Sequence, residues 1–209
     1  MKLQIAMDTL PPDKLLELFQ EVQEYVDIIE LGTPYVLQYG VGIIEDIRKI
    51  SRNVEILCDS KIMDAGYYEA DELFKKGADY VTVLAVTEYS TLADSVRAAK
   101  ENGKKIVADM ICVQEMKSKV EELEEIGVDV IAVHTGVDEQ AMGRTPLEDL
   151  KEIRKYCRKA AVAVAGGITY QSLDLYTEQK PDIIIVGGGI FKAADPVAET
   201  KKLYRAIRG

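Results

Sequence analysis

Two carboxylates and one ammonium group stand close together in residues 59–64, directly after the apolar run at residues 54–58. Residues two apart on a strand share a face, so the side chains of Asp59 and Lys61 should project together. A carboxylate beside an ammonium group at a strand terminus can bind a cation and stabilise developing negative charge. The same two residues could instead form a surface ion pair, which contributes little stability. The rest of the chain has to distinguish between these two interpretations.

Short apolar runs recur along the chain, and each is followed by a stretch with helical periodicity, such as residues 13–19. Many of the runs are nearly continuous in Val, Ile and Ala, which is typical of parallel strands buried on both faces. The eight predicted strands are residues 3–7, 26–31, 54–58, 80–86, 105–110, 130–134, 161–165 and 183–186.

An unbroken series of eight strand–helix units predicts a (β/α)8 TIM barrel, with residues 1–209 forming a single domain. No proline-rich or serine-rich linker divides the chain. An open doubly wound sheet is the alternative, and it usually carries a glycine-rich fingerprint after its first strand. Here the first strand is followed by Asp8-Thr9-Leu10, without glycine. The barrel is therefore the favoured fold.

The net charge of −10 argues against a surface for nucleic acid, because neutralising phosphates requires clustered Lys and Arg. A small phosphorylated ligand could still be held by backbone N–H groups. Cys58, Cys112 and Cys157 share no CxxC spacing and are expected to be reduced thiols. No apolar run is long enough to span a membrane, and the N-terminus leaves no room for a signal peptide. These features predict a cytoplasmic protein.

Polar side chains end or interrupt many of the predicted strands, and in a TIM barrel the catalytic residues come from the C-terminal strand ends. Any one of these residues could be a helix cap or a solvated strand end. His134 is the only histidine, and it could be a hydrogen-bonded core residue or a general base. Several polar groups on one rim favour a shared site. They are Asp8, Glu30, Asp59, Lys61, Asp109 and His134.

Glycine clusters follow the seventh and eighth predicted strands, at residues 166–167 and 187–189. Turns use glycine freely, so such clusters are weak evidence by themselves. After the last two strands of a barrel, however, they would let backbone N–H groups approach a phosphate at a helix N-terminus. This position predicts a phosphate site in an acidic protein without a basic patch.

Residues Asp59-x-Lys61-x-x-Asp64 resemble the DxKxxD signature of the orotidine monophosphate decarboxylase suprafamily. Five other sets of residues resemble its 3-hexulose-6-phosphate synthase branch: residues 6–8, 29–34 and 133–136, together with the two glycine clusters. The resemblance extends from the first strand to the last helix. The DxKxxD signature alone is shared by several activities, and its combination with Glu30, Asp109 and His134 is much narrower.

The resemblance implies a Mg²⁺-dependent aldol addition of formaldehyde to D-ribulose 5-phosphate, giving D-arabino-hex-3-ulose 6-phosphate. By analogy, Glu30 and Asp59 would hold the metal, and two carboxylates with additional oxygen ligands suit Mg²⁺. His134 would remove a C1 proton from the ketose. Lys61 and Mg²⁺ would stabilise the resulting enediolate, whose charge develops only as the proton leaves.

The resemblance also assigns supporting roles. Asp8 and Asp109 would position the substrate hydroxyls and Lys61. The family is dimeric, so Asp64 would reach into the active site of the neighbouring subunit of a homodimer. The phosphate group of the substrate would bind to the glycine clusters, at Gly167, Gly188 and Gly189.

Two other functions remain as alternatives. 3-Keto-L-gulonate-6-phosphate decarboxylase uses nearly the same residues, but that branch carries arginines where this chain has Val137 and Gly188, and a glutamate in place of Asp109. These differences favour the synthase. The second alternative is a non-catalytic sugar-phosphate-binding barrel, which the intact set of acids, lysine and histidine disfavours.

Overall fold

The computed structural model describes residues 1–209 and contains a closed barrel of eight parallel strands. The strands are β1 (Lys2–Met7), β2 (Ile28–Leu31), β3 (Glu55–Ile62), β4 (Tyr80–Leu84), β5 (Lys105–Asp109), β6 (Val130–His134), β7 (Ala161–Ala165) and β8 (Ile183–Val186). Each strand pairs with the next one along the chain, and β8 pairs with β1 to close the ring. The prediction of a (β/α)8 TIM barrel is confirmed.

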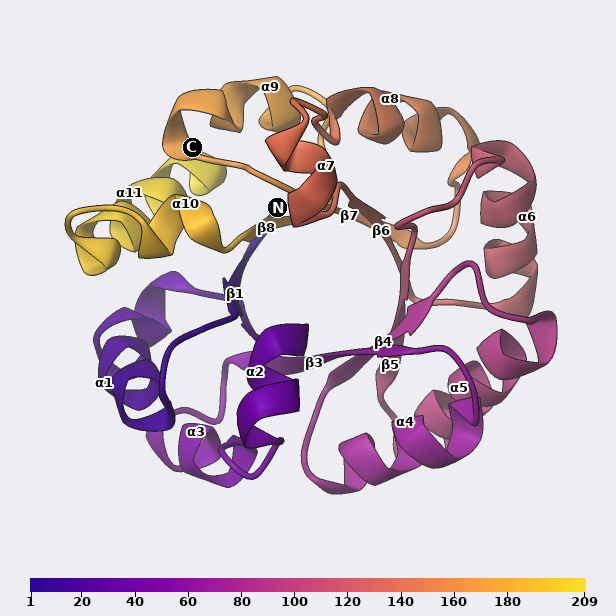
Figure 1. The fold of residues 1–209 in the computed structure, drawn as a ribbon, viewed down its shortest axis with the longest axis horizontal. Coiled ribbons are helices and arrows are strands. Elements are labelled where there is room, and N and C mark those ends of the chain that lie inside the picture. Colours follow the sequence, from indigo (N-terminus) through magenta and orange to yellow (C-terminus); the bar gives the residue numbers. More distant parts are fainter.

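Helices surround the ring of strands on the outside (Figure 1). They are α1 (Pro12–Val22), α2 (Thr33–Tyr39), α3 (Ile44–Ile50), α4 (Gly66–Lys75), α5 (Tyr89–Asn102), α6 (Met116–Ile126), α7 (Val137–Ala141), α8 (Leu147–Tyr156), α9 (Leu173–Thr177), α10 (Gly188–Phe191) and α11 (Pro196–Arg208). Two short 3-10 helices, Gln23–Tyr25 and Tyr170–Ser172, precede β2 and α9. None of the helices is both long and apolar enough to cross a membrane.

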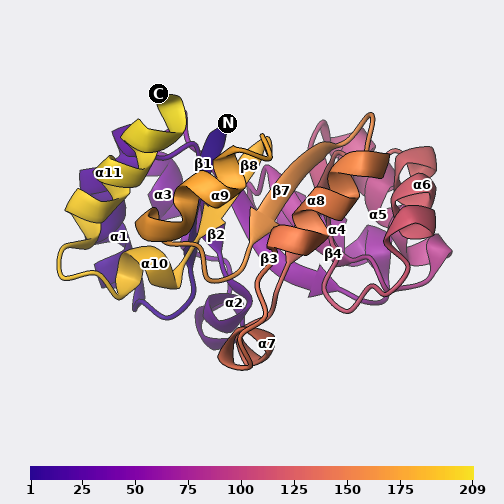
Figure 2. The same cartoon turned by 90° about the horizontal axis from the view of Figure 1, so that it is seen from above.

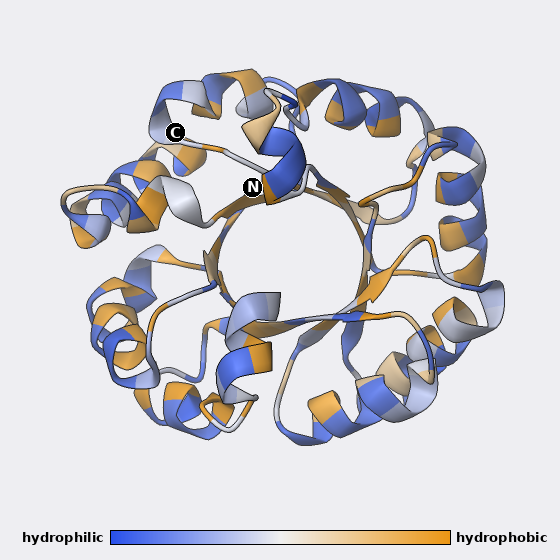
Figure 3. Cartoon of the chain, in the orientation of Figure 1, coloured by the Kyte–Doolittle hydropathy of each residue, from blue (hydrophilic) through white to orange (hydrophobic).

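Two hydrophobic cores follow from the alternation of side chains along each strand. The larger core joins the outward faces of the strands to the inner faces of the helices, and it includes Ile5, Phe19 and Leu203. Figure 3 shows the matching pattern of apolar and polar stretches on the outer helices. The smaller core fills the inside of the barrel with Ile28, Leu57, Tyr80, Val107, Val130, Ala132, Ala163 and Ile183. The barrel is therefore packed rather than hollow.

The expected strands agree with the observed ones except at their ends. The third strand was expected to end at Cys58, but β3 continues to Ile62, so Asp59 and Lys61 lie within the strand. The fourth strand was expected to extend to Val86, and β4 ends at Leu84. The extension of β3 includes an irregularity in its pairing with β4 between Cys58 and Ile62.

Four aspartates form a repeated motif at the N-terminal end of the barrel. Each one directly precedes an even-numbered strand, and its carboxylate accepts the N–H of a residue at the start of the preceding odd-numbered strand. The pairs are Asp27 with Leu3, Asp79 with Ile56, Asp129 with Ile106 and Asp182 with Val162, at 2.8–2.9 Å. These bonds tie the strands together in pairs at the end of the barrel away from the polar strand ends.

Two short helices, α2 and α7, extend beyond the C-terminal rim of the barrel. In Figure 2 they project from the side opposite both chain termini, and in Figure 1 they face each other across the barrel opening. Each follows its strand almost immediately, since α2 begins at Thr33 after β2 and α7 begins at Val137 after β6. They therefore flank the rim at which the polar strand ends meet.

Candidate active site

The polar residues of the rim stand directly above the apolar filling of the barrel. Residues two apart on a strand share a face, so Glu30 follows Ile28 into the interior. Asp59, Asp109 and His134 follow Leu57, Val107 and Ala132 in the same way. The apolar residues exclude water from below, and the polar groups face the open end of the barrel. This arrangement brings together the side chains that the sequence placed on one rim.

Asp59 and Lys61 form a close ion pair. The Nζ atom of Lys61 lies 2.9 Å from Oδ1 and 2.7 Å from Oδ2 of Asp59. Thr33 donates its hydroxyl to Oδ2 at 2.9 Å, and Thr82 donates to Oδ1 at 2.8 Å. The Asp59 carboxylate is almost fully buried, with 8% of the residue exposed. This pair is therefore part of a buried network and not the surface ion pair considered as an alternative.

Asp109 joins Lys61 to His134. Its Oδ2 atom lies 2.9 Å from Nδ1 of His134 and 3.1 Å from Nζ of Lys61, and its Oδ1 atom accepts the N–H of Ile111 at 2.9 Å. Burial opposes the charge of Asp109, but His134, Lys61 and the Ile111 N–H lower its pKa to about 2. Burial likewise opposes the charge of Lys61, and Asp109 and Asp59 nevertheless raise its pKa. Both groups are therefore charged at neutral pH.

Glu30 has a very different environment. Its Oε2 atom accepts a hydrogen bond of 2.6 Å from Nε2 of Gln4, a fully buried residue of β1. Burial, followed by repulsion from Asp59, raises the pKa of Glu30 to about 8, against the weaker opposing effects of Gln4 and Lys61. At neutral pH Glu30 therefore retains a proton, which a higher pH or a nearby positive charge would displace.

Asp8 lies where the ends of β1, β2 and β8 meet. A Cβ atom on Gly32 would stand 2.0 Å from its Oδ1, and a Cβ atom on Gly187 would stand 3.3 Å from its Oδ2. The absence of a side chain at Gly32 is thus what leaves room for this carboxylate. Burial and repulsion from Asp59 raise the pKa of Asp8. Asp8 forms no hydrogen bond with Lys61, so no direct contact supports its expected role in positioning that lysine.

The charges at this rim do not balance. Asp8, Glu30, Asp59 and Asp109 contribute four carboxyl groups, and Lys61 is the only lysine among them. Burial, followed by repulsion from Asp59, raises the pKa of both Asp8 and Glu30, so a divalent cation would relieve an excess of negative charge. No three His, Cys, Asp or Glu side chains converge on a preformed metal site. A cation here would take few protein oxygens and complete its coordination with substrate and water, which suits Mg²⁺.

The glycines of the two clusters differ in backbone conformation and in the space around them. Gly167 has φ +66° and donates its N–H to no acceptor in the protein. A Cβ atom on Gly189 would stand 2.3 Å from the carbonyl oxygen of Ile168, so this position admits no side chain. Gly188 has ordinary backbone angles, and a Cβ atom there would meet only the Lys192 side chain, at 3.6 Å. Gly188 and Gly189 begin α10, where the first N–H groups of a helix lack partners within it.

Asp64 is the one predicted site residue that lies apart from the others. It is exposed, and its Oδ1 accepts the N–H of Ala65 at 2.7 Å instead of contacting the buried network. Within one subunit, Asp64 therefore contributes nothing to the site. Its expected contribution to a neighbouring subunit remains a prediction.

Three residues that hold the site in place were not predicted from the sequence. Gln4 contacts Glu30, Thr33 contacts Asp59, and Thr82 contacts both Asp59 and Lys61. Gln4 and Thr82 are polar residues that interrupt apolar strands, and this interruption was a visible sign of a partner in the barrel interior. Thr33 gave no such sign, because it also suits the start of a helix.

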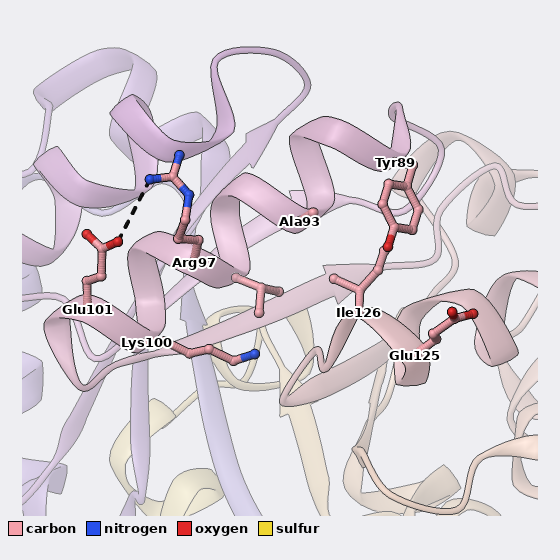
Figure 4. A pocket seen from close by; sticks show the side chains of 8 residues that line it. Tyr89, Ala93, Arg97, Lys100, Glu101, Glu125 and Ile126 are labelled. Atoms are coloured by element: carbon pink, nitrogen blue, oxygen red, sulfur yellow. Dashed lines mark ion pairs between the residues drawn. The ribbon is translucent and has the colours of Figure 1, made fainter.

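A hollow on the outer surface between α5 and α6 involves none of these residues. It is lined by Tyr89, Ala93, Val96, Arg97, Lys100, Glu101, Glu125 and Ile126, as Figure 4 shows. Its arginine pairs with Asp94 at 3.0 Å and with Glu101 at 3.8 Å. Two carboxylates therefore already neutralise the arginine of this hollow.

Comparison with known proteins agrees with the geometry. Residues 1–203 match the family described as orotidine 5'-phosphate decarboxylase / HUMPS. The chain belongs to this family. Over its full 209 residues it is 43% identical to a 3-hexulose-6-phosphate synthase of Staphylococcus epidermidis, and the match covers 100% of both proteins. The family resemblance proposed from DxKxxD is confirmed.

Solved structures give the same result. The 3-hexulose-6-phosphate synthase of Salmonella typhimurium superposes with a TM-score of 0.97 at 47% identity, covering 100% of this chain and 99% of that one. The 3-keto-L-gulonate-6-phosphate decarboxylase of Vibrio cholerae gives a TM-score of 0.84 at 23% identity over 99% of this chain and 97% of its own, which shows a shared fold. The relatives of the family are enzymes, and the expectation that this chain is an enzyme is confirmed.

Proposed function

We propose that this family member is a 3-hexulose-6-phosphate synthase, which adds formaldehyde to D-ribulose 5-phosphate and forms D-arabino-hex-3-ulose 6-phosphate. The observation that carries the proposal is the buried chain of contacts from Asp59 through Lys61 and Asp109 to His134. An imidazole and a fixed positive charge at one rim of the barrel support a reaction that needs a base and a stabilised anion. The full-length similarity to named synthases supports the same reaction.

The decarboxylase alternative has less support. Val137 and Gly188 stand where that branch carries arginines, and neither can pair with a phosphate or a carboxylate through its side chain. Asp109 is shorter than the glutamate of that branch, and here it reaches both Lys61 and His134. The similarity to the synthase structure, at 47% identity, is also greater than the 23% shared with the decarboxylase.

The metal proposal rests on the excess of negative charge at the rim. Glu30 and Asp59 would hold Mg²⁺, and Asp8 is a further carboxylate nearby. The bound ion would supply positive charge to the oxygens of the ketose and so favour loss of a C1 proton. Gln4, Thr33 and Thr82 would keep the two ligands oriented, as residues behind a metal ligand commonly do.

The protein's own residues would carry the proton and the charge. Asp109 is ionised and can only accept, so Nδ1 of His134 carries the hydrogen and Nε2 is left free to take the C1 proton. Lys61 would stabilise the negative charge that develops on the ketose oxygens. The C1 carbon of the enediolate would then attack the carbonyl carbon of formaldehyde. The proton on Nε2 could return to the alkoxide oxygen of the new product.

The phosphate of the substrate would bind between the last two strand ends. Gly167 offers an N–H group that has no partner in the protein, and Gly188 and Gly189 begin a short helix. Backbone N–H groups bind an anion without adding positive side chains. This fits an acidic chain whose last phosphate loop contains no arginine.

We also propose a homodimer in which Asp64 serves the partner's site. Met63 is 53% exposed and Tyr68 is 69% exposed, and both flank Asp64 on the chain. Exposed apolar residues around a charged residue suit an interface. Shared sites predict complementation: a mixture of D64N and H134N subunits should recover about a quarter of wild-type activity, because a hybrid dimer holds one intact site. Mixed subunits that remain as inactive as the parents would contradict shared sites.

The deciding assay measures formaldehyde consumption with ribulose 5-phosphate, with and without Mg²⁺, beside decarboxylation of 3-keto-L-gulonate 6-phosphate. The proposal predicts Mg²⁺-dependent formaldehyde consumption as the faster reaction. Faster decarboxylation would support the alternative enzyme. Binding of the sugar phosphate without either reaction would indicate a non-catalytic barrel.

A further inference from the structure

The backbone of β3 departs from a regular strand where it carries the Asp59–Lys61 pair. Cys58 pairs with Val81 and Ile62 pairs with Val83, so three residues of β3 lie opposite one residue of β4, Thr82. Lys61 has φ +47°, a left-handed conformation that side chains other than glycine rarely adopt. Such a conformation persists only where surrounding contacts hold it.

Thr82 forms hydrogen bonds with all three of the opposing residues. Its hydroxyl donates to Oδ1 of Asp59 at 2.8 Å and accepts the N–H of Lys61 at 2.9 Å. Its carbonyl oxygen accepts the hydroxyl of Ser60 at 3.0 Å. Thr82 is only 5% exposed, so water has little access to replace these bonds. One residue of β4 thus pairs with the whole irregular segment of β3.

The hydroxyl is essential to this arrangement because it donates and accepts at the same time. A methyl group of the same size would leave the Lys61 N–H without its acceptor and would remove one donor from Asp59. Thr33 would still hold Asp59, because the Thr33 hydroxyl contacts both Oδ2 and the backbone carbonyl oxygen of Asp59. The carboxylate would therefore keep one anchor, whereas the left-handed backbone of Lys61 would lose the only side chain bonded to its N–H.

We propose that Thr82 is a positioning residue, whose hydroxyl fixes the left-handed turn at Lys61 and so presents the Lys61 ammonium and the Asp59 carboxylate together to the substrate. What the pair then does to a sugar phosphate rests on the proposed function. The turn itself does not, because it is a property of the free chain.

The test compares T82V, which keeps the shape but loses the hydroxyl, with T82S, which keeps the hydroxyl. T82V should lower kcat by about 10- to 100-fold, the usual effect of losing a residue behind a metal ligand. The KM for ribulose 5-phosphate should change much less, because the phosphate contacts remain. T82S should restore most of kcat. T200V removes another fully buried threonine hydroxyl, on α11, and should leave kcat unchanged.

A crystal structure of metal-free T82V provides a measurement that does not depend on turnover. Lys61 should leave its positive φ, and its Nζ should move out of hydrogen-bonding distance of Asp59. If T82V does not fold, T82C and T82S provide the comparison, because a thiol is a much weaker donor than a hydroxyl. Wild-type kcat in T82V or T82C, or an unchanged Lys61 turn, would overturn the proposal. A wild-type chain without synthase activity would refute the proposed function, and the crystal structure would still decide the role of Thr82.

Discussion

His134 and Asp109 lie on neighbouring strands, and Nδ1 of the imidazole stands 2.9 Å from Oδ2 of the carboxylate. The carboxylate is buried, ionised and bonded through both of its oxygens. It therefore fixes the tautomer of the imidazole and directs Nε2 away from itself. The proposed base is thus oriented by the same residue that contacts Lys61.

Replacing Asp109 with asparagine should disrupt this orientation. Both oxygens of Asp109 accept hydrogen bonds, and an amide has only one accepting atom. D109N therefore loses either the Ile111 contact or the contacts to His134 and Lys61. We expect kcat to fall by about 10² or more, with a smaller change in KM for ribulose 5-phosphate. Steady-state kinetics on the folded variant check this, and a kcat within threefold of wild type would contradict it.

The raised pKa of Glu30 predicts how the stability of the metal-free protein depends on pH. Its pKa is raised by burial from 4.5 to about 8, so the folded chain holds a proton that the unfolded chain releases. The stability from this group is fully present below about pH 4.5 and is lost as the pH rises through about 8. E30Q removes this loss, so its Tm in EDTA at pH 9 should exceed that of wild type by roughly 3 °C or more. Calorimetry across pH 6 to 9 tests this, and parallel curves would refute it.

Mg²⁺ provides the complementary measurement on the same residue. The ion binds the ionised carboxylate, so binding should displace the Glu30 proton and tighten as the pH rises toward about 8. Titration calorimetry in buffers with different ionisation enthalpies reports the protons released. Binding of Mg²⁺ to E30Q that matches wild type in affinity and proton release would exclude Glu30 as a ligand.

Substitution of Gly188 tests phosphate binding without disturbing folding. It has ordinary backbone angles and room for a Cβ atom, so G188V should fold. A larger side chain should obstruct the approach of the phosphate and raise KM for ribulose 5-phosphate by about 10-fold or more, with little change for formaldehyde. The matched variant is G189A, whose Cβ would collide with the Ile168 carbonyl oxygen and should destabilise the loop itself. An unchanged sugar KM in folded G188V would remove this residue from the phosphate site.

The aspartates at the N-terminal end should affect stability without affecting catalysis. Asp79 accepts the N–H of Ile56 and contacts Arg48 and Lys104. Burial opposes its charge, but these partners hold the pKa of Asp79 below its ordinary value, so its stabilising effect is lost as the pH falls into the acid range. D79N should lower the free energy of unfolding by about 2 kcal/mol at pH 7 and leave kcat unchanged.

The control for this prediction is D46N, which breaks an exposed ion pair on α3 and should cost less than about 0.5 kcal/mol. Urea denaturation measures both variants. Equal effects of D79N and D46N would show that the strand-linking carboxylate contributes no more than a surface charge.

The sequence was sufficient to predict the barrel and most of the polar rim. Parallel strands alternate with helices in this chain, and the period of two along each strand places Glu30, Asp109 and His134 on the inner face once the barrel closes. Asp59 and Lys61 also meet as predicted. They do so through an irregular strand with a left-handed lysine, and not through the regular alternation on which the prediction was based.

The remaining features depend on distant parts of the chain. Lysine has no preference for positive φ, so the sequence of β3 alone does not predict the turn at Lys61. Its hydrogen-bond partner, Thr82, comes from the next strand. Gln4 interrupts an apolar strand, but its partner Glu30 comes from β2 and is identified only once the two strands pair. The four aspartates before β2, β4, β6 and β8 each accept an N–H from a neighbouring strand, and only the closed barrel shows which one.

Exchange of the C1 proton of ribulose 5-phosphate with solvent deuterium, in the absence of formaldehyde, tests the proposed enediolate chemistry most directly. If His134 removes that proton, the wild-type enzyme should catalyse exchange in the presence of Mg²⁺, and EDTA should stop it. H134N should fold and reduce the exchange rate by about 10² or more, because the chain contains no other imidazole. Exchange by H134N at the wild-type rate, or formaldehyde consumption by a wild-type enzyme that catalyses no exchange, would contradict the account.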